Sequence, residues 1–224
     1  MSAALLPLLK AAVAAGPAGR SYSYNGYYES TSNASSRTFS GCNIGAAATG
    51  RVVVVCAQST GVGVTDITSV TIGGNAASLA AKYTDAGNNV AIGIWYLQVD
   101  AGTTADIVVT NSGTGSRHNI HVYSLYDLDS GTPADTDAQA ANSTSVSNTL
   151  TRASGGGIAI GVANANSSST SFTWTNLGED QDATTESTRR VSAASDDDGG
   201  SGDLTITATI TVTANVYLVS AVWA

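Results

Sequence analysis

Charged side chains are scarce in this sequence. Asp, Glu, Lys and Arg make up 12% of the 224 residues, against about 25% in an average soluble domain. Disordered acidic tails and coiled coils both need many charges, so neither class fits. With 42% hydrophobic residues the chain can still build a substantial core. Its solubility must come from Ser, Thr, Asn and Gly.

Basic residues are rarer still. The chain has only two lysines, Lys10 and Lys82, and a formal net charge of −8. The adjacent pair Arg189 and Arg190 lies close to the acidic run at residues 196–198. Proteins that bind nucleic acids cluster Lys and Arg against phosphates, so we expect no nucleic-acid partner.

Cysteine occurs only twice, at Cys42 and Cys56. The two lie on either side of residues 45–50, a small-residue stretch typical of a hairpin turn. If that hairpin forms, the cysteines can face each other at a separation that a disulfide spans. Two buried free thiols that pack as small hydrophobic groups are the alternative, and the sequence leaves both open.

A long hydrophobic run is also missing, and a membrane span needs about 20 apolar residues. An apolar stretch in the first sixteen residues is interrupted by Lys10, and no basic residue precedes it, so it lacks the pattern of a secretory signal. Pro7 suits a first helical turn and Gly16-Pro17 ends a helix, which predicts a helix over about residues 7–15. We interpret it as an arm that packs on its own sandwich or on a neighbouring subunit through Leu5, Leu6, Leu8, Leu9 and Val13.

Beyond the arm, apolar and polar residues alternate with a period of two, which is typical of β-strands. Turns rich in Gly, Asp and Asn separate the segments. The expected strands are residues 51–57, 67–73, 90–99, 105–110, 119–128, 157–163, 171–176, 189–194, 203–213 and 216–223. Because no helices are available to cover a parallel sheet, we expect an all-β fold: an antiparallel two-sheet sandwich of jelly-roll type.

The pattern predicts three regions. Residues 1–19 form the apolar arm, and residues 37–224 form a single sandwich domain. Between them, residues 20–36 are a tyrosine-rich linker or an edge strand, in which Tyr alternates with Ser. Within the sandwich, five strands from residues 52–125 match five from residues 158–222 in order and spacing, which suits two related sheets of one sandwich.

Residues able to carry chemistry are few. His118 and His121 are three apart and would point to opposite faces of a strand, so they cannot share a metal without a bulge; we interpret them as surface residues. No nucleophile elbow, phosphate-binding glycine loop before a helix, or Cys-His pair occurs. Trp95, Trp174 and Trp223 could stack on sugars, but their apolar neighbours favour core packing.

Acidic residues gather in two groups. A glycosidase needs two carboxylates across a cleft, and calcium takes oxygen ligands, but acidic turns that keep a charge-poor sandwich soluble are commoner. We therefore expect no catalytic residues, no metal and no cofactor. The groups are Glu179, Asp180, Asp182 and Glu186, and Asp196, Asp197, Asp198 and Asp203.

Three stretches resemble a recurrent pattern: residues 67–77 (ITSVTIGGNAA), residues 94–96 (IWY) and residues 101–109 (AGTTADIVV). The pattern is similar to small β-sandwich proteins of tailed bacteriophages, particularly those infecting alphaproteobacteria. Residues 122–125 and 217–223 fit the same layout, so the resemblance covers roughly residues 38–223. It implies a virion component such as a capsid decoration, fibre or tail accessory protein, and it carries over no catalytic residue.

A rigid sandwich with an apolar arm and no evident active site suits a subunit bound to a larger shell. We therefore expect a structural protein of a phage virion that binds other virion proteins and copies of itself. The alternative is a carbohydrate-binding or adhesin module with a host glycan as ligand. A glycan-degrading enzyme that uses the acidic groups ranks third.

Overall fold

The computed structural model describes residues 19–224 except residues 65, 116, 186 and 187, and all regular elements among them are β-strands. The helix expected over residues 7–15 lies outside the described residues. The first half of the chain contains β1 (Ser21–Ser30), β2 (Ala34–Asn43), β3 (Val52–Thr60), β4 (Ile67–Ile72), β5 (Asn75–Ala76), β6 (Ser78–Asp85), β7 (Val90–Gln98), β8 (Thr104–Gly115) and β9 (Arg117–Tyr126). The second half contains β10 (Asp135–Arg152), β11 (Gly157–Ala165), β12 (Thr173–Thr175), β13 (Gly178–Thr185), β14 (Arg189–Asp198) and β15 (Gly202–Trp223).

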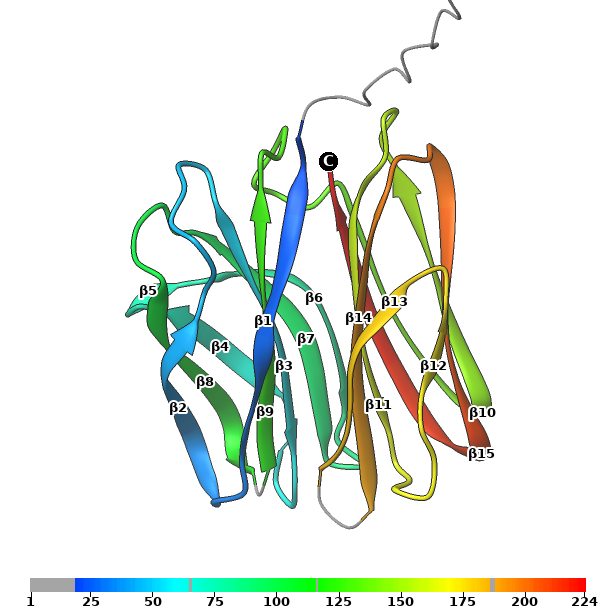
Figure 1. Ribbon diagram of the computed structural model, residues 1–224. Helices are drawn as coiled ribbons and strands as arrows, with labels where there is room; N and C mark the ends of the chain where they lie inside the picture. Colours follow the sequence, from blue (N-terminus) through cyan, green and yellow to red (C-terminus); the bar gives the residue numbers. More distant parts are fainter. Residues whose placement is uncertain (1–18, 65, 116, 186–187) are drawn as a thin grey trace, which may run out of the picture.

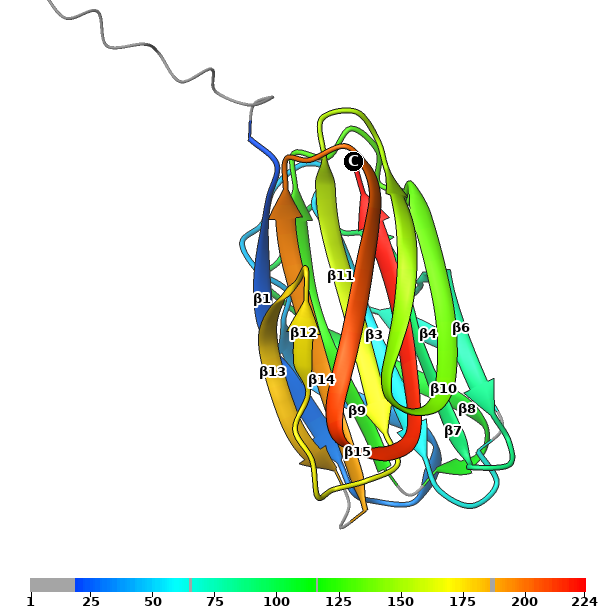
Figure 2. The ribbon, with the colours of Figure 1, turned by 90° about the vertical axis from the view of Figure 1, so that its right-hand side faces the viewer.

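The strands stack in four layers (Figure 1). The first outer layer has the order β2-β8-β4-β5, and the first inner layer has the order β1-β9-β3-β7-β6. The second inner layer has the order β10-β15-β11-β14-β13. β10 bends at the register shift between Ser143 and Ser145, and β15 bends opposite it, between Thr209 and Ala214. The outer parts of both strands form the second outer layer with β12 (Figure 2). Every pairing is antiparallel.

The two halves share one strand topology. β3, β7, β9 and β6 of the first half correspond to β11, β14, the last part of β15 and β13 of the second half. Likewise β1 and β2 correspond to the two parts of β10, while β8 and β4 correspond to the first part of β15 and to β12. Each half is a jelly-roll-like sandwich of an inner and an outer layer. The five matched segments of the sequence therefore belong to two related sandwiches, and the expectation of two sheets within one sandwich was wrong.

A pair of bulges supports this correspondence. In β6 the pairing with β7 shifts between Leu79 and Ala81, and in β13 the pairing with β14 shifts between Glu179 and Gln181. The first shift lies opposite Trp95 of β7, and the second lies opposite residue 194 of β14. These two residues occupy equivalent positions in the two halves. An extra residue bends an edge strand and breaks its pairing, so the two halves share a local irregularity as well as an order of strands.

Burial explains which segments have continuous apolar sequence. β3 and β11 lie at the centres of the inner layers, and every residue of both strands is buried. Such strands need apolar side chains on both faces. In the outer part of β15 only every second residue is buried, including Leu204, Ile206 and Ala208. The all-β antiparallel sandwich predicted from the sequence is confirmed, as four layers in place of two.

Three apolar cores hold the layers together. One lies within each sandwich and the third lies between the two inner layers, where Val52, Val54, Ile158 and Ile160 meet. Because buried apolar side chains of both halves pack against one another in this third core, the halves form one packed body.

Polar contacts also join the inner layers. Near the ends of β3 and β11, the buried Asn164 side chain donates to Oε1 of Gln58 at 3.0 Å. These two residues occupy equivalent positions on β3 and β11. The relation between the halves is therefore close to a twofold rotation, in which a position meets its own counterpart.

Candidate functional site

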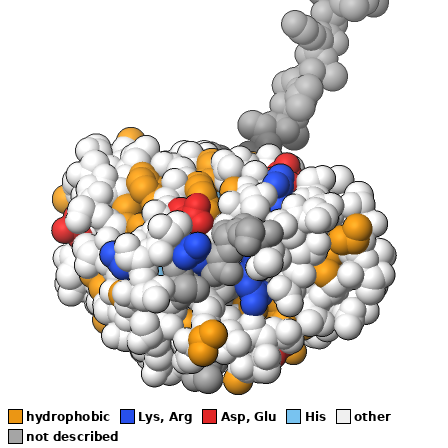
Figure 3. Space-filling model, turned by 90° about the horizontal axis from the view of Figure 1, so that it is seen from below, with side chains coloured by type: hydrophobic (Ala, Val, Ile, Leu, Met, Phe, Trp, Pro, Cys, Tyr) orange, Lys and Arg blue, Asp and Glu red, His pale blue; other side chains and the backbone are white. Residues whose placement is uncertain are grey.

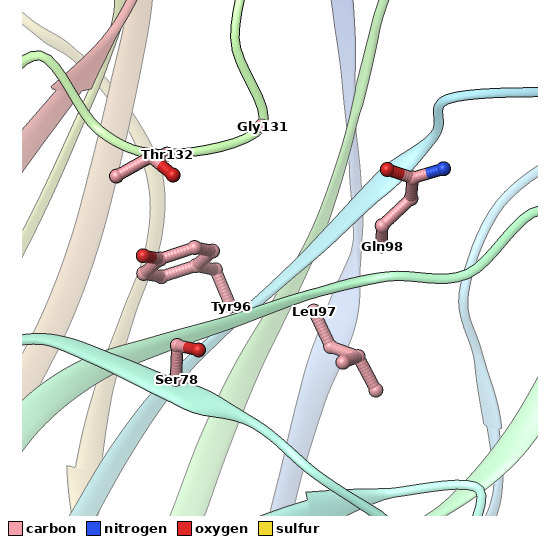
Figure 4. A pocket seen from close by; sticks show the side chains of 6 residues that line it. All are labelled: Ser78, Tyr96, Leu97, Gln98, Gly131 and Thr132. Atoms are coloured by element: carbon pink, nitrogen blue, oxygen red, sulfur yellow. The ribbon is translucent and has the colours of Figure 1, made fainter.

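A cavity of about 290 Å³ lies where the first half passes into the second. It is lined by Ser78, Tyr96, Leu97, Gln98, Gly131 and Thr132. Figure 4 shows the Tyr96 ring beneath the Gly131–Thr132 backbone, with Gln98 across from it and Leu97 pointing away. No lining side chain carries a charge.

The strand ends create this pocket. β6 begins at Ser78, which pairs with Tyr96, so β7 extends beyond its neighbour to Gln98. The connection at residues 127–134 then folds over the uncovered end of β7. It is held there because the amides of Asp129 and Ala134 donate to the carbonyls of Ala224 and Val222 at 2.9 and 2.7 Å.

Two contacts fix the side chains of the pocket. Tyr96 and Trp223 pack edge to face with ring centroids 6.1 Å apart. The Gln98 amide nitrogen donates to Oδ1 of Asp100 at 3.0 Å. The Gln98 amide oxygen lies on the side facing Tyr96 (Figure 4), which leaves an acceptor for a ligand.

The cysteines do not form the predicted hairpin pair. Cys42 lies on β2 in the first outer layer and Cys56 lies on β3 in the first inner layer, so the strands are not neighbours. Both thiols are free and buried in different cores. Burial raises the pKa of Cys42 to about 11 and raises that of Cys56 further. Both thus fit the alternative of small packing groups.

The two histidines are buried, contrary to the prediction of surface residues. Nδ1 of His118 lies 3.2 Å from the hydroxyl of Ser59 and 3.1 Å from the Asn111 amide. His121 contacts Tyr24 and lies on the other face of β9. Burial lowers the pKa of His118, and it lowers that of His121 to about 3, so both are neutral at pH 7.

The two acidic groups do not form one site. The half-buried Asp180 accepts hydrogen bonds from Tyr123 and Ser195, and its partial burial raises its pKa. Asp182 forms a two-pronged ion pair with Arg190 at 2.6 and 2.9 Å. Asp197 and Asp203 are exposed, and Glu186 lies outside the described residues. Within the described part of the chain, no three His, Cys, Asp or Glu side chains lie together as metal ligands would.

The tryptophans pack as predicted. Trp223 and Trp95 are buried in the cores, and Trp174 packs against the core of the second half. The proposed anchor residues Leu5, Leu6, Leu8, Leu9 and Val13 lie outside the described residues.

Sequence reasoning missed Arg51, a fully buried cation. Its guanidinium ties two loops together, at residues 44–51 and 99–103, through carbonyl oxygens alone. Hydrogen bonds to charged groups contribute about 1.5–3 kcal/mol, so Arg51 stabilises the end of the molecule beside the pocket. The acceptors, at 2.8–3.0 Å, are Gly45, Ala46, Val99, Ala101 and Gly102.

Negative charge concentrates at the same end of the molecule, where β7 and β9 end and β10 begins (Figure 1). The arginines there, Arg20, Arg51 and Arg152, donate to carbonyl oxygens. This end therefore has a negative potential that disfavours anionic ligands. The aspartates on these strand ends and loops are Asp100, Asp106, Asp127, Asp129, Asp135, Asp137, Asp196, Asp197 and Asp203.

The outward faces of both outer layers carry hydroxyl side chains. In the second outer layer Ser147 and Thr207 lie 2.8 Å apart and Thr149 and Thr205 lie 3.3 Å apart, each pair across neighbouring strands. In the first outer layer Ser36 and Thr110 form the same kind of pair at 3.3 Å. Seen from the opposite end in Figure 3, charged and apolar side chains form only small, separate spots.

No model of a known protein family matches the chain, and neither does any curated protein. The described part of the chain contains no helix with the length and hydrophobicity that a membrane span requires.

Proposed function

We propose that this protein is a structural, non-catalytic subunit of a bacteriophage virion, of decoration or accessory type, and that it binds neighbouring subunits. The observation that carries the proposal is the four-layer body with two outer layers on opposite sides. Each outer layer presents uncharged hydroxyl groups already paired across strands. A rigid block of this kind offers two broad faces to neighbours at little entropic cost.

The sequence adds two supports. The strand-and-turn stretches at residues 67–77, 94–96 and 101–109 resemble phage β-sandwich proteins. The apolar arm offers Leu5, Leu6, Leu8, Leu9 and Val13, each contributing roughly 1.5–3 kcal/mol if fully buried. Many copies on one particle would multiply a modest contact.

A deletion of residues 1–18 tests the arm. It removes none of the described strands, so we expect a soluble, folded β-protein that no longer sediments with particles. The measurement is mass spectrometry of gradient-purified particles made with the full chain or the truncated chain. Absence of the full chain from purified particles would refute the virion proposal, and normal incorporation of the truncated chain would assign the contact to the sandwich.

A substitution on the second outer layer tests the sandwich face. Thr207→Arg places a charge at the centre of the hydroxyl face, whereas Thr31→Arg adds the same charge in the β1–β2 connection. We expect the first variant to incorporate poorly and the second normally, with similar thermal stability. Equal incorporation of both would remove this face from the contact.

The Tyr96 pocket favours a second candidate, a carbohydrate-binding or adhesin module. This candidate does not exclude the first, because a virion subunit can also bind a host glycan.

A further inference from the structure

The pocket beside Tyr96 has the size of a small ligand. Ligand pockets usually span about 300–1,000 Å³, and this one, at about 290 Å³, lies at the lower limit. It can hold one ring of six or so atoms, but it cannot enclose a chain of several units. Any longer ligand must bind here through one terminal or branching unit.

The lining groups suit a hydroxylated ring. Tyr96 supplies an aromatic surface and a hydroxyl, Ser78 and Thr132 supply further hydroxyls, and Gln98 supplies a free amide oxygen (Figure 4). Protein hydroxyls both donate and accept, while an amide oxygen accepts. Sugar hydroxyls also do both, and the apolar C–H face of a sugar packs on an aromatic ring. A purely apolar ligand would leave these polar groups without partners, which is costly.

The charges around the pocket restrict the kind of sugar that can bind. The carboxylate of Asp100 accepts from Gln98 at the pocket wall, and the surrounding strand ends carry other aspartates. The nearby Arg51 is buried and already bound to five carbonyl groups. Anionic sugars would meet repulsion without a compensating cation.

The pocket is also held in shape before any ligand binds. Tyr96 packs on Trp223, Gln98 is fixed by Asp100, and the connection above is pinned to the last strand by two backbone hydrogen bonds. Little conformational entropy is then lost on binding.

The second half of the molecule has no counterpart. At the positions equivalent to Tyr96, Gln98 and Ser78, the chain has Ser195, Asp197 and Gly178. Ser195 donates to Asp180 inside the molecule. The topology that the halves share therefore does not require an aromatic side chain at the position of Tyr96.

We propose that this pocket binds a single neutral sugar unit of a glycan. The inference does not rest on the virion proposal, and either can fail alone.

The test is titration of the ¹⁵N-labelled full chain with methyl glycosides of galactose, glucose, mannose and N-acetylglucosamine, followed by the amide resonances of Gly131 and Thr132. At least one glycoside should give saturable shifts with a dissociation constant on the order of millimolar, as a small open site allows. N-acetylneuraminic acid, which is anionic, should give none. Failure of all four neutral glycosides, or binding of the anionic sugar alone, would overturn the proposal.

Variants locate the site. Tyr96→Ala should weaken binding by roughly tenfold or more, whereas Tyr96→Phe keeps the ring and most of the affinity. Thr132 is exposed in the connection, so Thr132→Trp should block the pocket without unfolding the chain. Its matched control is Thr31→Trp at the other end of the molecule. Unchanged binding by Thr132→Trp would place the sugar elsewhere and refute the assignment.

Discussion

The two halves of this protein reach the same topology with different side chains. The core of the first half contains Phe39, Trp95 and several valines, whereas the core of the second half contains many alanines. In the first half the core tryptophan, Trp95, lies on the inner strand β7. In the second half that position is Ala194, and Trp174 reaches in from the outer strand β12.

The chain also turns differently in the two halves. β1 and β2 are separate strands, as are β8 and β9, but their counterparts run continuously through the bends of β10 and β15. Strand order and register are thus common to both halves, while the core side chains and the corner geometry are not. Hydrophobic pattern and total volume suffice for such a fold, and individual side chains can vary.

Separating the two halves should have the largest effect on the protein. Residues 19–130 alone would expose the apolar face formed by Val52, Val54, Cys56 and Ile94. We expect this fragment to aggregate or to pair with a second copy through that face, as measured by size-exclusion chromatography with light scattering. A soluble monomeric fragment would show that the shared core is dispensable.

Giving one residue the side chain of its counterpart in the other half should also reduce stability. Gly161 corresponds to Val55, but a Cβ atom on Gly161 would lie 2.8 Å from Trp174. We expect Gly161→Val to reduce the free energy of unfolding by about 1–3 kcal/mol through overpacking, as measured by urea denaturation. Adding Trp174→Ala should recover part of the loss; no recovery would place the strain elsewhere.

The hydrogen-bonded counterparts Gln58 and Asn164 should show coupling. Gln58→Leu leaves the buried Asn164 amide without its acceptor, and we expect a cost of about 1–3 kcal/mol. Replacing Asn164 as well removes the orphaned group, so the double variant should be more stable than the sum of the single variants implies. A double-mutant cycle measures this coupling, and strict additivity would contradict it.

A smaller effect, on the pH dependence of stability, should distinguish two hydrogen bonds that join the halves. Tyr123 donates to Asp180, and Tyr217 donates to Asp85, each at 2.9 Å. Burial raises the pKa of Asp180, whereas the hydrogen bond from the Asn88 side chain chiefly lowers that of Asp85. The two carboxylates should therefore affect stability with opposite pH dependence.

The native state holds the proton of Asp180 to higher pH than the unfolded chain does, so Asp180 makes stability fall as pH rises above the unfolded value of about 4. Asp85 stabilises the fold above that value and loses this contribution as pH falls through its lower native pKa. Relative to wild type, Asp180→Asn should gain stability with rising pH and Asp85→Asn should lose it. Urea titrations between about pH 3 and 7 measure both, and equal slopes would contradict the assignment.

The central strands could be predicted because layers on both sides make them apolar. The valines of β3 and the alternation in β4 gave their positions directly. The edge strands β6, β10 and β13 were missed, because their mixed burial leaves polar and apolar residues without a clear period. Residues 20–36 hold the edge strand β1 and the start of β2, so the structured body begins before residue 37.

The candidate site was largely hidden in the sequence. Tyr96 was noticed only within a stretch that resembles phage proteins, and Thr132 was not singled out. The pocket exists because residues 127–134 fold over β7, and no local pattern encodes that path. The burial of His121 and Arg51 was missed for a related reason, since a polar residue within a strand gives no sign of the layers above it.

The connection at residues 127–134 has a further consequence. Two separate copies of one sandwich, paired through their inner layers, would dissociate on dilution and would present identical exteriors. A covalent link keeps the halves together at any concentration and lets each exterior change on its own. A single chain therefore carries two outer faces that can diverge from each other in sequence while staying in a fixed one-to-one ratio.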